Sequence, residues 1–122
     1  MSNVTTLPVS DPVAAIVADC RAKYPNPQIE LVSVQTRVSL FVLRSPTAQE
    51  HRVFMASLRD DAMKGEATRN LFVTMCVYPE PIAVTSLVDR YGGVLAHPKV
   101  QNAIAWLTGQ ADELQGKSWP AP

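Results

Sequence analysis

The sequence predicts an α+β fold that is mostly helical. Apolar residues recur at helical spacing over residues 12–24, and this pattern is typical of an amphipathic helix. β-branched residues then crowd the stretch 29–43, as they do in strands. Helix starts, apolar stripes and helix stops alternate from residue 47 to 109. We therefore expect an N-terminal helix, a small antiparallel β element and a bundle of about four helices.

The first helix has clear boundaries in the sequence. Asp11 suits the N-cap and Pro12 the first helical position. The apolar residues of its stripe are Val13, Ile16, Val17, Cys20 and Tyr24. The prolines at 25 and 27 end the helix.

The stretch 29–43 is too long for one ordinary strand. The polar residues Gln35, Thr36 and Arg37 lie at its middle and favour a hairpin. No glycine-containing turn marks the reversal, so a bent single strand is the alternative. Apolar residues occupy both faces near its end, as in a strand covered by helices.

A strand-to-helix junction follows at residues 44–50. Pro46 favours extended backbone at the residue before it and so ends the strand. Thr47 as N-cap and Glu50 three residues later form a capping box. The helix should run to about Asp61, and its inner face should carry His51, Phe54, Met55 and Leu58.

The later segments read mainly as helices. Residues 67–78 are apolar on nearly every side, which favours a buried helix, and a strand is the competing interpretation for 71–77. A helix after the Pro79–Pro81 break should close at Gly92 and Gly93. The last helix should span roughly residues 98–108.

The composition indicates one globular domain. The chain has 122 residues, of which 47% are hydrophobic and 18% are charged, unlike a disordered chain. We expect residues 1–10 to form a flexible arm, residues 11–109 the globular domain and residues 110–122 a flexible C-terminal tail.

Charge and targeting signals narrow the class of partner and the compartment. Eleven basic and eleven acidic residues give zero net charge, so nucleic acid is not an expected partner, while self-association stays open. Residues 1–6 lack signal-peptide features, and no apolar run is long enough to cross a bilayer. Cys20 and Cys76 lie in apolar runs and are expected to be buried free thiols. These features favour a reducing cytoplasm without membrane contact.

The sequence indicates no enzyme, metal or cofactor site. The only histidines, His51 and His97, have no cysteine or second histidine nearby. No nucleophile and base are placed as a catalytic site requires. Trp106 lies off the inner stripe of the last helix and Trp119 lies in the tail. Both are candidate partner-binding residues, since tryptophans often dominate interfaces.

The junction also resembles a pattern in a known family, the tail assembly chaperones of long-tailed bacteriophages. The residues that carry this resemblance are Arg44, Pro46, Thr47 and Glu50, followed by an apolar run at 71–77 that closes in Tyr78 and Pro79. The similarity covers roughly residues 38–109. His51 stands where the family more often has an aromatic residue.

The resemblance implies a non-enzymatic role in the host bacterial cytoplasm. Such chaperones bind the long, helical tape-measure protein before the tail tube polymerises, and they leave before the virion is complete. The alternative is another small phage morphogenesis or tail-completion protein that stays in the particle.

Chaperone genes of this family often carry a ribosomal frameshift site near their end. Gln115, Gly116 and Lys117 can be encoded by codons that contain a slippery string. We therefore hypothesise a minority extended product, which requires those codons and a long overlapping reading frame downstream.

Overall fold

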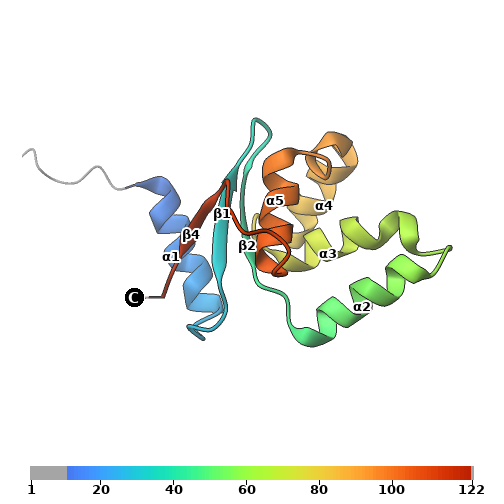
Figure 1. The fold of residues 1–122 in the computed structure, drawn as a ribbon. Coiled ribbons are helices and arrows are strands. Elements are labelled where there is room, and N and C mark those ends of the chain that lie inside the picture. Colours follow the sequence, from blue (N-terminus) through green and yellow to red (C-terminus); the bar gives the residue numbers. More distant parts are fainter. Residues whose placement is uncertain (1–10, 122) are drawn as a thin grey trace, which may run out of the picture.

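The computed structural model describes residues 11–121, so the arm expected at residues 1–10 lies outside the described residues. Within 11–121 the fold is α+β and mostly helical, as predicted (Figure 1). The α-helices are α1 (Pro12–Lys23), α2 (Ala48–Arg59), α3 (Ala67–Met75), α4 (Pro81–Arg90) and α5 (Pro98–Leu107). The strands are β1 (Leu31–Gln35), β2 (Leu40–Arg44), β3 (Cys76–Tyr78) and β4 (Lys117–Trp119), and the short 3₁₀ helices are η2 (Lys64–Glu66) and η3 (Gly92–Val94).

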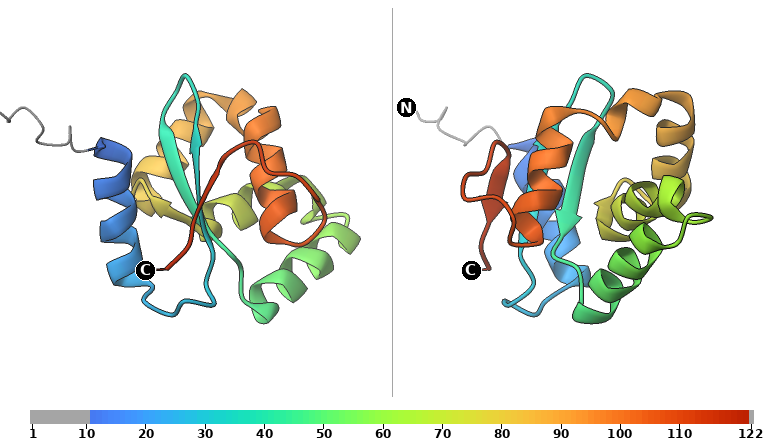
Figure 2. Two further views of the ribbon diagram at one scale, coloured as in Figure 1. Left: turned by 60° about the vertical axis from the view of Figure 1, so that its left-hand side comes forward. Right: turned by 45° about the vertical axis from the view of Figure 1, so that its right-hand side comes forward.

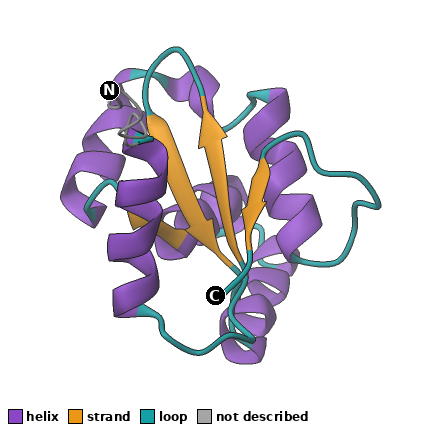
Figure 3. Ribbon diagram, turned by 90° about the vertical axis from the view of Figure 1, so that its left-hand side faces the viewer, coloured by secondary structure: helices purple, strands orange, loops and turns teal. Residues whose placement is uncertain are grey.

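The strands form one antiparallel sheet in the order β3-β2-β1-β4. Helix α1 covers one face of this sheet, and α3, α4 and α5 lie on the other (Figures 1 and 2). The sheet is therefore the middle layer between helices (Figure 3). Helix α2 lies at the periphery beside α3.

Strand alternation explains why both faces are covered. Leu31, Val42 and Val77 point to the α1 face, where they pack with Val17 and Cys20 of that helix. The neighbouring residues along each strand point to the opposite face, where apolar ones join the larger core. The sheet residues of this larger core are Val32, Val34, Phe41, Leu43 and Cys76.

The stretch 29–43 is a hairpin, and the bent single strand is excluded. β1 pairs with β2 from Leu31↔Arg44 to Gln35↔Leu40. Thr36 makes the turn, since its Oγ1 accepts from the backbone N–H groups of Val38 (3.2 Å) and Ser39 (3.1 Å). The threonine hydroxyl thus stabilises this turn by hydrogen bonds, without the positive φ that glycine supplies in the commoner hairpin turns.

The segment 67–78 changes from helix to strand. Helix α3 ends at Met75, and Cys76–Tyr78 form strand β3 at the edge of the sheet. The prediction of a helix through to residue 78 was therefore wrong over its last turn. Pairing with β2, where Val42 opposes Tyr78, outweighs continuation of the helix.

The prediction that residues 110–122 form a tail outside the domain was wrong at residues 117–119. These residues are strand β4, which pairs with β1 from Leu31↔Trp119 to Ser33↔Lys117. Asn102 of α5 holds the intervening loop, since its amide donates to the Glu113 carbonyl (2.8 Å) and accepts from the Gln115 N–H (2.6 Å). The end of the chain therefore belongs to the sheet.

No helix among the described residues is long and apolar enough to cross a membrane.

Candidate functional site

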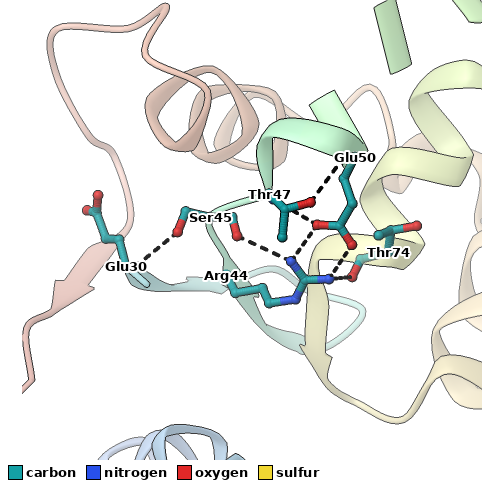
Figure 4. Close-up of polar contacts among 6 residues, drawn as sticks. All are labelled: Glu30, Arg44, Ser45, Thr47, Glu50 and Thr74. Carbon is teal, nitrogen blue, oxygen red and sulfur yellow. Dashed lines mark hydrogen bonds and ion pairs between the residues drawn. The ribbon is translucent and has the colours of Figure 1, made fainter. Parts of the chain in front are cut away.

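The junction between β2 and α2 is built around one ion pair (Figure 4). Two guanidinium nitrogens of Arg44 donate to the two carboxylate oxygens of Glu50, and both N···O distances are 2.7 Å. The Arg44 side chain is 10% exposed and that of Glu50 is 26% exposed. A bidentate pair of this kind is stronger and more directional than an ordinary surface salt bridge.

Glu50 also closes the capping box of α2. The Thr47 hydroxyl accepts from the Glu50 N–H (3.1 Å), and Glu50 Oε1 accepts from the Thr47 N–H (2.9 Å). The hydrogen bonds from Arg44, followed by those from Thr47, lower the pKa of the Glu50 carboxyl to about 2. Glu50 is therefore ionised at neutral pH and already bound, so it is no general acid or base.

Arg44 links the junction to elements that are distant in sequence. Its guanidinium donates to the Thr74 carbonyl near the end of α3 (3.1 Å). Its Cζ lies 5.2 Å from the ring centre of Tyr24, which follows α1. Since cations are attracted to aromatic faces, Arg44 connects α1, α2 and α3 through β2.

The two segments that carry the family resemblance therefore meet in space. Arg44 of the first segment binds Thr74 of the second, and Val42 pairs with Tyr78. The Tyr78–Pro79 peptide bond is cis, and Pro79 directly follows β3. Pro46 lies between the end of β2 and the Thr47 N-cap, as predicted. These residues hold the scaffold together.

The candidate partner-binding tryptophans both make contacts within the chain. Trp106 Nε1 donates to Glu30 Oε2 (2.5 Å), and the ring is half-buried against the larger core. Trp119 Nε1 donates to the Ser33 hydroxyl (2.8 Å), and the ring packs on the α1 side of the sheet. Their indole N–H groups are thus already satisfied, and each ring joins chain segments that are far apart in sequence.

The surroundings of the cysteines and histidines in residues 11–121 bear on whether they could act as ligands or nucleophiles. No cluster of at least three possible metal ligands occurs among residues 11–121. Burial raises the pKa of both the Cys20 and the Cys76 thiols, which disfavours the reactive thiolate. Both cysteines are buried and free, as predicted. His97 caps α5, since its Nδ1 accepts from the Lys99 N–H (3.1 Å).

Sequence reasoning missed a groove between α2 and α3. None of the residues of α2 is fully buried, and the expected inner-face residues are only half-covered. A cavity of about 220 Å³ lies between the helices, with Phe54 and Leu71 among its lining residues. Val53 (55% exposed) and Met63 (43% exposed) also line it. We call this cavity, with Val53, Phe54, Met63 and Leu71 in its lining, the α2–α3 groove.

The apolar residues of α2 recur at helical spacing, a pattern that predicts burial in a bundle. Instead α2 packs mainly on α3 and leaves part of its apolar surface open.

No protein-family model, curated protein or solved structure matches the chain.

Proposed function

We propose that this chain is a tail assembly chaperone of a long-tailed bacteriophage. It binds the tape-measure protein in the host cytoplasm during tail morphogenesis and is absent from the mature virion. The observation that carries the proposal is the α2–α3 groove, where Val53 and Met63 remain exposed beside the cavity. The role requires binding and release but no chemical step.

The groove has the chemistry that an amphipathic helix recognises. Its floor is apolar, and its polar lining residues are mostly uncharged: Gln49, Ser57, Asn70 and Thr74. Glu50 is the one ionisable residue in the lining, and Arg44 neutralises it. An apolar helix ridge can therefore enter without burying an unpaired charge.

The junction supports the proposal in a second way. The residues that resemble the chaperone family are those that fix α2 to the sheet, through Arg44, Thr47 and Glu50. They set the position of α2 and hence of the groove. The motif thus lies at the start of the helix that forms one wall of the proposed binding surface.

The frameshift hypothesis has a structural consequence under this proposal. A slip at Gln115–Lys117 would give a product without Ser118 and Trp119. That product would lack most of β4 and the hydrogen bond from Trp119 to Ser33. The normal and extended products would then differ at one edge of the sheet.

The groove is tested by co-expressing this chain with the long helical protein encoded downstream of its gene. We expect the wild-type chain to co-purify with that protein and to keep it soluble. Val53→Asp and, separately, Met63→Asp should each reduce the recovered complex about tenfold, because a carboxylate in the groove must lose its hydration when the partner binds.

Ile82 provides a matched control. Among residues 11–121 it is the most exposed large apolar side chain, at 81%, and it lies on α4 outside the groove. Ile82→Asp makes the same chemical change and should leave complex recovery unchanged. Equal losses in all three variants, or none in the groove variants, would contradict the proposed binding surface.

A further inference from the structure

A second cavity lies where the tip of the β1–β2 hairpin meets the connection between α4 and α5. Its volume is about 240 Å³, and Arg37, Val38, Tyr91, Val94 and His97 are among its lining residues. The hairpin tip and this connection lie at the same end of the molecule (Figures 1 and 2). None of its lining residues belongs to the α2–α3 groove.

Two guanidinium groups flank one tyrosine at this cavity. The Cζ of Arg37 lies 6.0 Å from the ring centre of Tyr91, and that of Arg90 lies 5.2 Å from the same centre. The aromatic ring attracts both cations. Each still has the planar set of donors that binds carboxylates in a bidentate manner.

These guanidinium groups lack an anionic partner within the described chain. Neither Arg37 nor Arg90 makes a side-chain hydrogen bond or an ion pair with residues 11–121, and no carboxylate lines the cavity. Asp89, next to Arg90 in sequence, is bound to Arg69 at 2.8 Å. The positive charges of Arg37 and Arg90 are therefore not neutralised by a carboxylate of residues 11–121.

His97 adds a donor to the same wall. Its Nδ1 accepts a hydrogen bond from the Lys99 backbone, so that nitrogen carries no proton. The ring proton is then on Nε2, which is free to donate. The first turn of α5 begins directly after His97 and adds a partial positive charge.

We propose that this cavity binds an acidic peptide segment of a partner protein. A glutamate or aspartate carboxylate would pair with Arg37 in the cavity wall, and Arg90 beside the same tyrosine ring would add positive charge. A neighbouring aliphatic side chain would rest on Val38 and Val94. This proposal does not depend on the α2–α3 groove or on the chaperone role. The chain as a whole is neutral and has no basic stripe, which favours a peptide over nucleic acid.

The test is a titration followed by the amide signals of the full chain in NMR spectra. The ligand is a short synthetic peptide with a leucine between two glutamates, and the comparison peptide has glutamine in place of each glutamate. We expect saturable shifts confined to residues 36–38 and 91–97 with the glutamate peptide. The glutamine peptide should bind at least about tenfold more weakly, and added salt should weaken the glutamate peptide.

Variants separate the arginine pair from general charge effects. The double variant Arg37→Gln/Arg90→Gln should lose about tenfold or more in affinity while its spectrum stays dispersed. Arg59→Gln removes another exposed arginine, far from the cavity in sequence, and should bind as wild type does. Equal binding of both peptides, unchanged binding by the double variant, or tighter binding of a single-stranded oligonucleotide at the same residues would overturn the proposal.

Discussion

Arg44→Met is expected to lower the free energy of unfolding by about 3 kcal/mol, because it leaves Glu50 without the cation that neutralises it. The Thr74 carbonyl and the Tyr24 ring lose their contacts with the guanidinium in the same variant. Chemical denaturation measures the change as a lower midpoint with an unchanged slope.

Thr47→Ala is the matched comparison, since it removes the capping hydroxyl and leaves the ion pair in place. Its expected cost is about 1 kcal/mol of unfolding free energy.

The pKa of Glu50 is lowered from 4.5 to about 2 by folding. The pair's stabilisation is therefore complete above pH 4.5 and is lost as the pH falls towards 2. The difference in the free energy of unfolding between wild type and Arg44→Met should therefore decrease as the pH falls from 4.5 towards 2. An Arg44→Met cost no larger than that of Thr47→Ala would contradict the central role of the pair.

Trp119→Ala is expected to destabilise the fold by about 3 kcal/mol, whereas the same change in a flexible tail would cost almost nothing. The ring packs with the residues between α1 and the sheet, and its Nε1 donates to Ser33. Its loss opens a void on that face and leaves the buried Ser33 hydroxyl without this donor. Thermal or chemical unfolding measures the effect.

Asp112→Ala is the control for Trp119→Ala. Asp112 lies in the same C-terminal segment, is exposed, and precedes the loop that Asn102 holds. Its replacement should change stability by no more than about 0.5 kcal/mol. Similar small effects for both variants would mean that β4 adds little to the sheet.

Local signals predicted the fold class and several boundaries correctly. The cap at Asp11 accepts from the Val13 N–H, and the Thr47–Glu50 capping box is present as expected. Gly109 ends the last helix with a φ of 83°, where a residue without a side chain is favoured. Each of these features depends on residues that are close in sequence.

Long-range contacts account for what the sequence did not predict. Residues 117–119 are too few for an alternation of polar and apolar side chains to be recognised. They form a strand because they pair with β1, which begins at Leu31. Strand β3 likewise exists because β2 lies beside it. The link from Arg44 to Thr74 crosses thirty residues of sequence. Propensity alone cannot report such contacts.

The two candidate surfaces differ in how far the sequence could have revealed them. The apolar stripe of α2 was visible, but its incomplete burial depends on where α3 lies. Arg90 is the sequence neighbour of Tyr91, but only the fold brings the distant Arg37 to the same ring. Their pairing carries no local signal, since single exposed arginines are common on any protein surface.

The function proposed for the α2–α3 groove also separates two classes of morphogenesis protein. The groove of a chaperone is occupied only while the partner helix is unassembled, whereas a structural subunit remains in the particle. Exposed apolar residues such as Val53 fit a surface that is covered for part of the time.

Protein content before and after tail completion is the measurement that tests the chaperone role most directly. Mass spectrometry would compare purified virions with complexes isolated on the tape-measure protein from cells in which tails are assembling. We expect this chain in those complexes and its absence from the virions. Stoichiometric amounts of the chain in purified virions would contradict the chaperone role and identify a structural subunit.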